Sequence, residues 1–240
     1  MKFITTYKST NYDHRTKKSK IKFVIIHYTA MYSLKETLKY LCDPKSKVSS
    51  HFLVSKKGKI YKLINEENRA WHAGASYWNK IRDLNSYSIG IELENTGHYL
   101  NFEKYSTRQI KSLIKLLKYI QFYYKIKKRN VLGHSDISPM RKIDPGEKFP
   151  WNILEKNKLA YLPKIKKINN SIDIKTVKLT DYKIRLKSMG YNIRINNKND
   201  NIFKNTMRSF QMHYQQNFVT GYPNGKTFLL LDQFCKDMID

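Results

Sequence analysis

A run of six mostly apolar residues, 21–26, limits the possible folds of this chain more than any other feature. Its length and its Phe, Val and Ile side chains predict a buried β-strand, because a typical helix needs roughly ten residues or more. The run ends at His27, where a histidine can either complete the core or face a functional site. Both interpretations of His27 stay open from its position alone. A buried strand requires covering elements, so the segments that follow decide the fold class.

Helices and further strands alternate after this first strand. Residues 33–41 and 106–123 each carry an apolar stripe at helical spacing, and each begins with a Ser followed three residues later by Glu or Gln, which predicts a capping box. Residues 50–63 predict a β-hairpin, and residues 87–95 and 130–132 predict two more strands. The chain is therefore predicted to form an α/β domain with a mixed central β-sheet flanked by helices.

The strand predicted after residue 87 has two different faces, because successive side chains of a strand point in opposite directions. Ile89, Ile91 and Leu93 form its apolar face, and Glu92 and Glu94 lie on the other face. Carboxylates on one face of a strand are usually solvated surface groups. Their position alone therefore assigns them no function.

A fourteen-residue segment, 133–146, concentrates polar chemistry in one loop. It contains His134, two aspartates and Lys142, while Pro139 and Pro145 fix φ at two positions. The segment follows the apolar strand predicted before it, so His134 is expected to leave a buried strand at the start of the loop. A loop stiffened in this way suits a metal site or a catalytic site better than a plain surface turn.

Three residues of these segments carry the side chains that a catalytic zinc site uses. His27 and His134 each follow a predicted strand, and Asp144 lies in the stiffened loop. Two histidines and one carboxylate leave a fourth coordination position for water. The gap of ten residues between His134 and Asp144 is not required by any coordination geometry. Residue chemistry alone therefore leaves zinc as one of several interpretations.

The composition changes after residue 155, which predicts a division of the chain. Residues 1–155 form the first domain, and the Lys- and Asn-rich residues 156–178 read as a linker. Residues 179–240 predict a small domain of three short helices. We expect these helices to begin at Thr180, at Asn205 or Thr206, and at Thr227. A three-helix unit of this size has a small core, so it is expected to lean on the first domain.

The chain is strongly basic, with a formal net charge of +27 over 240 residues. Such a surface attracts polyanions, which include nucleic acids, anionic lipids and cell-wall polymers. Arginine, the better reader of phosphate and guanine, supplies only nine of the 46 basic residues, which argues against a dedicated nucleic-acid-binding protein. No apolar run is long enough for a transmembrane helix, and residues 1–20 lack the apolar core of a signal peptide.

Four separated motifs occur in order and together resemble one known family. They are His27-Tyr28-Thr29, the Trp-His-Ala-Gly of residues 71–74, the strand of residues 88–94, and the loop of residues 133–146. Over about residues 20–155 the chain resembles the zinc-dependent N-acetylmuramoyl-L-alanine amidases, whose fold is shared with peptidoglycan recognition proteins. Residues 180–238 are similar to the three-helix peptidoglycan-binding module often attached to such enzymes.

The resemblance implies a function for specific residues of this chain. It implies that His27, His134 and Asp144 bind one Zn²⁺ per chain, and that the enzyme cleaves the amide bond between N-acetylmuramic acid and L-alanine of the stem peptide. It also implies catalytic roles for two residues. Glu92 would act as general base and then general acid, and Lys142 would stabilise the oxyanion of the tetrahedral intermediate.

The resemblance leaves other roles less sharply defined. We expect Trp71 and His72 to line the substrate groove, with burial in the core as the alternative for Trp71. Asp136 is expected to brace the loop and not to take part in the chemistry. A non-catalytic peptidoglycan recognition protein is the alternative for the whole chain, although the presence of all three ligands favours an enzyme.

The expected partners are peptidoglycan or soluble muropeptides, with no specific nucleic acid. The C-terminal module favours a polymeric substrate and therefore the cell envelope or periplasm as the location. The cytoplasm is the alternative, because no signal peptide is visible. A nucleic-acid-binding protein, suggested by the charge alone, is the third possibility for the chain as a whole.

Overall fold

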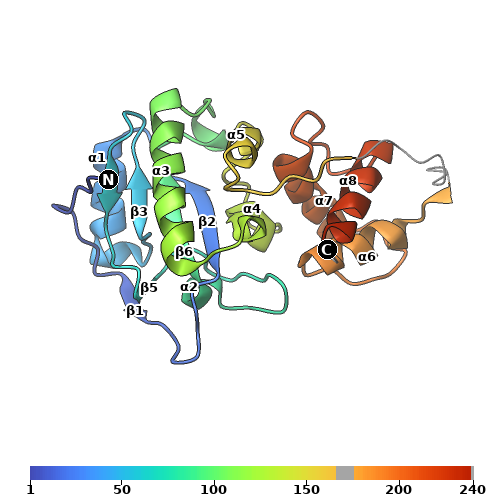
Figure 1. Cartoon of the computed structure of the whole chain (residues 1–240), viewed down its shortest axis with the longest axis horizontal. Helices are drawn as coiled ribbons and strands as arrows, with labels where there is room; N and C mark the ends of the chain where they lie inside the picture. Colours follow the sequence, from blue (N-terminus) through green and yellow to red (C-terminus); the bar gives the residue numbers. More distant parts are fainter. Residues whose placement is uncertain (166–175, 239–240) are drawn as a thin grey trace.

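A five-stranded mixed sheet with the strand order β4-β3-β6-β2-β7 lies at the centre of the protein in this computed structural model, which describes residues 1–165 and 176–238 (Figure 1). Strand β2 runs parallel to β6 and β7, β6 runs parallel to β3, and β3 pairs with β4 as an antiparallel hairpin. A separate two-stranded sheet pairs β1 with β5. The strands are β1 (Tyr12–His14), β2 (Phe23–Tyr28), β3 (Phe52–Val54), β4 (Ile60–Lys62), β5 (Asn68–Ala70), β6 (Ser88–Leu93) and β7 (Val131–Gly133).

Helices cover this sheet, which confirms the predicted α/β class. The α-helices are α1 (Leu34–Cys42), α2 (Leu84–Tyr87), α3 (Thr107–Tyr124), α4 (His134–Ile137), α5 (Trp151–Lys156), α6 (Leu179–Met189), α7 (Asn201–Tyr214) and α8 (Gly225–Lys236). Short 3-10 turns occupy Pro44–Ser46, His98–Leu100 and Lys128–Asn130. Helices α1 and α3 begin where the sequence predicts, since the hydroxyls of Ser33 and Ser106 accept the backbone N–H three residues later.

The two faces of the sheet belong to different hydrophobic clusters. Val24 and Ile26 of β2 pack in the cluster that contains the apolar stripe of α3. Phe23 and Ile25, which alternate with them, belong to a cluster on the opposite side. Because side chains alternate along a strand, His27 continues the face of Phe23 and Ile25 and points away from α3.

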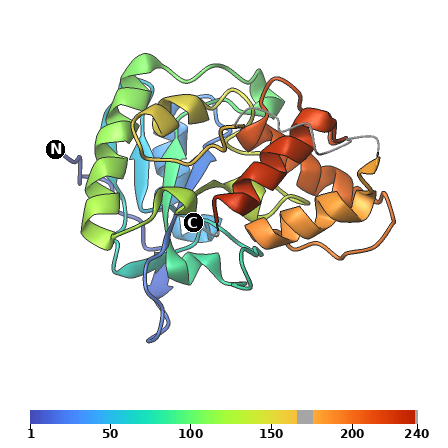
Figure 2. The same cartoon turned by 45° about the vertical axis from the view of Figure 1, so that its right-hand side comes forward.

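The C-terminal helices α6, α7 and α8 pack beside the sheet domain (Figures 1 and 2). Their buried side chains, which include Leu186, Phe203 and Phe210, share one cluster with Phe23 and Ile25 of β2. The three helices expected from the sequence are therefore present, and their apolar faces are buried in common with one face of the sheet. The predicted contact of this segment with the first domain is observed.

The starting residues predicted for these helices were wrong. Helix α7 begins at Asn201, where the Asp200 carboxylate accepts the Phe203 N–H at 2.9 Å. Thr206 lies inside the helix and its hydroxyl donates to the Ile202 carbonyl, a bond that interior threonines commonly make. Helices α6 and α8 likewise begin before the predicted Thr180 and Thr227, at residues 179 and 225.

The predicted division into residues 1–155, 156–178 and 179–240 stays a prediction, and its residues 166–175 and 239–240 lie outside the described part of the chain. The first residues of the predicted linker do pack: Leu159 and Ala160 are buried in the α3 cluster, and the Gln121 amide donates to the Leu159 carbonyl at 2.9 Å. Within residues 1–165 and 176–238, no helix is both long and apolar enough to cross a membrane.

Candidate metal centre

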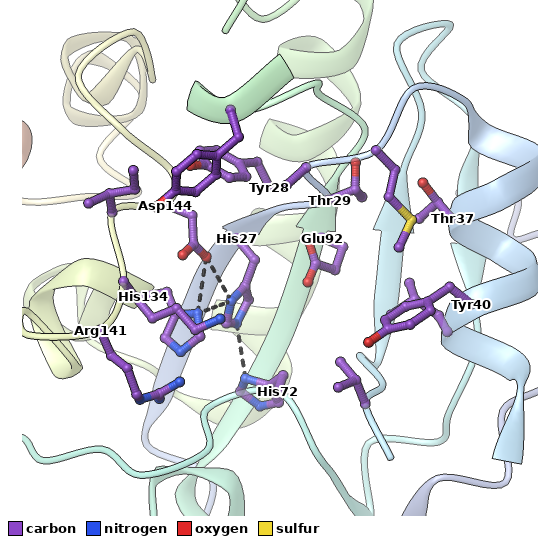
Figure 3. Close-up of a pocket in the computed structure, with 17 residues that line it drawn as sticks. His27, Tyr28, Thr29, Thr37, Tyr40, His72, Glu92, His134, Arg141 and Asp144 are labelled. Carbon is purple, nitrogen blue, oxygen red and sulfur yellow. Dashed lines mark hydrogen bonds and ion pairs between the residues drawn. The ribbon is translucent and has the colours of Figure 1, made fainter. Parts of the chain in front are cut away.

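The candidate site lies at the carboxyl ends of three neighbouring parallel strands. His27 occupies the end of β2, and Glu92 is its partner in register on β6. His134 follows β7 directly and begins α4, while Asp144 comes from the loop after α4. All four side chains line a cavity of about 290 Å³ whose opposite wall includes Thr37 and Tyr40 of α1 (Figure 3). The fold therefore brings together residues that are up to 117 positions apart in the sequence.

Three of these side chains converge on one point. The Nδ1 atoms of His27 and His134 lie 2.9 Å apart, and the Asp144 Oδ2 lies 3.2 Å from the first and 3.1 Å from the second. All three residues are buried. The predicted metal ligands thus form one cluster, and each offers one atom to its centre.

Hydrogen bonds on the far side of each imidazole determine which nitrogen carries the proton. The His134 Nε2 lies 3.2 Å from the Ala73 carbonyl oxygen, so it is the protonated nitrogen and its Nδ1 keeps a lone pair. A backbone carbonyl in this position is a common outer partner of a metal-binding histidine.

The proton of His27 is assigned by a chain of hydrogen bonds through His72. The Ser88 hydroxyl donates to the Leu84 carbonyl at 2.6 Å, so its oxygen accepts from the His72 Nε2 at 3.2 Å. The His72 Nδ1 is therefore an acceptor, and it lies 3.0 Å from the His27 Nε2 (Figure 3). His27 donates through Nε2, and its Nδ1 lone pair faces His134 and Asp144.

This arrangement fits a metal cation. Two nitrogen lone pairs and a carboxylate oxygen face one another at about 3 Å, which is repulsive unless a positive charge lies among them. Burial, together with His134, lowers the pKa of His27 to about 4, so its ring is neutral at pH 7. Two imidazole nitrogens and one carboxylate oxygen form a donor set that suits zinc.

Glu92 is a buried carboxyl group beside this cluster. Its side chain points into the cavity (Figure 3), and its Oε2 has no hydrogen-bond partner among the described residues. Burial first, and then the charge of Asp144, raise the pKa of Glu92 to about 8, with Lys142 acting in the opposite direction. A carboxyl group that takes up and releases a proton near neutral pH is suited to general acid–base catalysis.

Two cationic side chains border the same cavity. Lys142 is half-buried and lines it, as the sequence predicts for a residue that faces the substrate. Arg141 lines it as well, and its Nη2 donates to the carbonyl oxygens of Ala73 and Ala75 at 3.0 Å each. Arg141 therefore holds the loop that also accepts the His134 N–H.

Trp71 and His72, predicted to line the substrate groove, occupy different environments. His72 lines the cavity but is buried, and its ring contacts His27 from below (Figure 3). Trp71 is half-buried and is not among the residues that line this cavity. The structure therefore places His72 where it can orient a metal ligand, a role that the sequence reasoning missed.

Two further residues support His72 and were also missed. The Asn85 side-chain oxygen accepts the N–H groups of His72 and Ala73 at 3.1 and 2.7 Å. Gly90 leaves room for the ring, because a Cβ at this position would lie 2.4 Å from the His72 Cγ. A glycine in the middle of an apolar strand was the one available signal, since such glycines often mark the close approach of another group.

Known proteins are similar to this chain in both sequence and architecture. Residues 17–147 match the family described as N-acetylmuramoyl-L-alanine amidase. The chain is 34% identical over 227 residues to N-acetylmuramoyl-L-alanine amidase AmiD of Escherichia coli, which covers 87% of this chain and 80% of AmiD. It is 34% identical over 162 residues to 1,6-anhydro-N-acetylmuramyl-L-alanine amidase AmpD of Haemophilus influenzae, which covers 60% of this chain and 85% of AmpD.

Two solved structures are similar over nearly the whole chain. Escherichia coli AmiD, in complex with the substrate anhydro-N-acetylmuramic acid-L-Ala-D-gamma-Glu-L-Lys, superposes with a TM-score of 0.81 at 31% identity over 93% of each chain. Pseudomonas aeruginosa AmpDh3 superposes with a TM-score of 0.84 at 28% identity over 100% of each chain. Together with the geometry of the histidine–histidine–aspartate cluster, these similarities show that the chain belongs to the N-acetylmuramoyl-L-alanine amidase family.

Proposed function

We propose that this protein is a zinc amidase that hydrolyses the amide bond between N-acetylmuramic acid and L-alanine in peptidoglycan fragments. The observation that carries the proposal is the convergence of the His27, His134 and Asp144 donor atoms beside the buried Glu92 carboxyl group, whose Oε2 has no hydrogen-bond partner among the described residues. Family membership supplies the reaction class, and the residues supply the chemistry.

His27, His134 and Asp144 would hold one zinc ion. When bound, zinc supplies Lewis acidity that brings the pKa of a water ligand to about 7. Three protein ligands would leave a fourth coordination position for that water, and Glu92 lines the same cavity. Their outer hydrogen bonds keep the lone pairs directed at the ion.

Glu92 moves the proton in this reaction. Its carboxylate takes a proton from the attacking water as the water oxygen bonds to the lactyl carbonyl carbon. The same carboxyl group then gives this proton to the nitrogen of L-alanine as the carbon–nitrogen bond breaks. The products are the lactyl carboxylic acid and a free amine, so atoms and charge balance. A divalent cation nearby favours the ionised form of Glu92 that the first step needs.

Lys142 stabilises the charge that develops on the substrate. During attack the carbonyl oxygen becomes an oxyanion, and a cation fixed near this oxygen lowers the barrier. Lys142 is a candidate because it lines the cavity and carries its charge close enough to affect the pKa of both Glu92 and His27.

We propose muropeptides, and anhydro-muropeptides among them, as substrates. This rests on relatives that are similar over most of the chain: AmiD was solved with an anhydromuramyl peptide, and AmpDh3 with anhydromuramic pentapeptide. We further propose that helices α6–α8 bind the polymer, which would favour the cell envelope as the location. Trp71 remains a candidate contact for substrate because it is only half-buried.

Product analysis tests this function. The purified protein with zinc is incubated with an anhydromuramyl tetrapeptide, and the products are identified by mass spectrometry. We expect a free tetrapeptide with L-alanine at its amino end, together with anhydro-N-acetylmuramic acid. Binding of the muropeptide without release of peptide would instead identify a recognition protein, and cleavage at any other bond would contradict the assignment. Comparing the rates on anhydro-muropeptide and on intact sacculi distinguishes the soluble substrate from the polymer.

A further inference from the structure

Asp136, in the same loop as two of the metal ligands, is the centre of a buried polar cluster that connects the sheet domain to the C-terminal helices. Its Oδ2 accepts the Gly133 N–H at 2.8 Å and lies 2.7 Å from the His213 Nδ1 of α7. Its Oδ1 accepts the Tyr191 hydroxyl at 2.8 Å and lies 3.4 Å from the Ser209 hydroxyl. We call these four residues, Asp136, Tyr191, Ser209 and His213, the Asp136 cluster.

Every member of the Asp136 cluster is at most 3% exposed. A carboxylate removed from water in this way is costly unless hydrogen bonds replace its hydration. Among residues 1–165 and 176–238, the side-chain donors to Asp136 all come from residues 191–213, so the C-terminal segment supplies what the carboxylate needs. The orientation of Asp136 is therefore set largely from outside the sheet domain.

The Asp136 Oδ2 that lies against His213 also binds the turn that carries the proposed metal ligand His134. Asp136 accepts the N–H of Gly133. This glycine immediately precedes His134, the first residue of the four-residue helix α4. The Ser135 N–H in the same turn donates to the Asp144 carbonyl at 2.9 Å. Gly133 also lies against Pro145, since a Cβ on this glycine would be 2.7 Å from the proline Cδ. The turn therefore fixes His134 and Asp144 relative to each other.

We infer that the C-terminal helices position the metal ligand His134 through Asp136, with His213 and Tyr191 as positioning residues. This rests on the proposed zinc site. The C-terminal segment then has a second role besides any contact with polymer: it completes the support of the metal centre. Loss of a hydrogen bond made directly by a metal-binding histidine typically lowers metal affinity by roughly tenfold to a hundredfold. Asp136 acts one step further out, through the Gly133 backbone, so a smaller loss is expected.

The His213 ring allows the hydrogen bond to be separated from packing. It stacks on Trp151 of α5 with ring centroids 3.6 Å apart, and on Tyr214 at 3.9 Å. His213→Phe keeps an aromatic ring for this stacking and removes the N–H that Asp136 accepts. His213→Asn removes the aromatic ring but keeps an N–H donor for Asp136, because the Asn side-chain amide nitrogen takes roughly the place of Nδ1. Tyr191→Phe removes one hydroxyl and nothing else.

A matched control comes from the same helix. The Gln211 side chain is buried and bonds only to residues 220–222 in the hydrogen bonds that the structure describes, so Gln211→Met weakens the C-terminal segment without touching Asp136. Zinc dissociation constants of the full-length variants are measured by competition with a chelating dye, and thermal melting checks that each variant is folded.

We expect His213→Phe to weaken zinc binding severalfold, up to about tenfold, which is the lower end of the range for a direct outer partner of a ligand. Tyr191→Phe should weaken it less, His213→Asn should lie between His213→Phe and the wild type, and Gln211→Met should lower the melting temperature but leave zinc affinity unchanged. Wild-type zinc affinity in folded His213→Phe would overturn the inference while leaving the proposed function intact, and so would an equal loss in Gln211→Met. Should His213→Phe not fold, unchanged affinity in Tyr191→Phe overturns it. A wild-type protein that binds no zinc contradicts the proposed function itself.

Discussion

His27 and Glu92 are paired in register on the adjacent parallel strands β2 and β6, and both side chains point to the sheet face opposite α3. In-register neighbours on parallel strands lie side by side, so the backbone itself holds the proposed metal ligand His27 next to the proposed proton carrier Glu92. Two regular strands give this pair a rigidity that loops do not provide. The remaining ligands come from the segment after β7, on the other side of β2.

Replacing Glu92 removes the proposed proton carrier. We expect Glu92→Gln to lower kcat by roughly 10²- to 10⁴-fold, which is the typical contribution of a positioned acid–base group. Zinc content should stay at one ion per chain, because Glu92 is not one of the three converging ligands. The measurement is steady-state kinetics on a muropeptide together with metal analysis. Glu94→Gln, a change just beyond the end of β6, serves as the control and should retain activity.

The same substitution should stabilise the metal-free protein in a pH-dependent way. In the folded protein burial raises the pKa of Glu92 from 4.5 to about 8. Between these pH values the folded state keeps a proton that the unfolded state has released, so the free energy of unfolding falls as the pH rises. Gln carries no such proton and removes this dependence.

We therefore expect metal-free Glu92→Gln to gain stability over the wild type between pH 4.5 and pH 8, by on the order of 1 kcal/mol or more at the upper end. Urea unfolding at several pH values measures this gap, with Glu94→Gln as the reference. A gap that stays constant from pH 4.5 to pH 8 would show that Glu92 titrates normally.

Lys142 should affect the transition state more than substrate binding. We expect Lys142→Met to lower kcat by about 10²- to 10³-fold with a smaller change in KM, because the oxyanion exists only during reaction. Lys142→Arg, which keeps the charge, should retain more activity than Lys142→Met. Steady-state kinetics on one muropeptide distinguishes these cases. Equal kcat values for Lys142→Met and the wild type would show that Lys142 does not stabilise the transition state.

Gly90 tests the support that His72 gives to His27. In Gly90→Ala the new methyl group would overlap the His72 ring, which must move and release the His27 N–H. We expect lower stability and roughly tenfold or greater loss of zinc affinity. The double variant Gly90→Ala with His72→Ala relieves the overlap, so its melting temperature should recover in part while its zinc affinity stays low. Recovery of both would show that His72 contributes only packing.

The sequence was sufficient to predict the elements that carry the site, because each has a strong local pattern. The apolar run before His27 predicted β2, and alternation placed Glu92 opposite Ile91. The α/β class and the family were both confirmed, and the family match over residues 17–147 includes the four motifs. Helix α3, with its long apolar stripe and its Ser106 cap, was predicted to within one residue at its carboxyl end.

Two kinds of feature could not be predicted from the sequence. One is contact between residues that are far apart in the chain, and the other is the start of a helix where several possible capping residues lie close together. Nothing near His72 indicates that it meets His27, 45 positions away, and nothing near Asp136 indicates His213, 77 positions away. The helix starts in the C-terminal segment were wrong because several capping residues lie close together. There Asp200 caps α7, whereas Thr206 bonds within the helix.

Zinc titration of the stripped enzyme tests the central claim most directly. The full-length protein is freed of metal with a chelator, and its amidase activity on a muropeptide is measured as zinc is added in fractions of an equivalent. We predict activity that rises linearly and levels off at one zinc per chain, with His134→Ala inactive throughout. Full activity in the chelator-treated protein, or in zinc-free His134→Ala, would contradict the account.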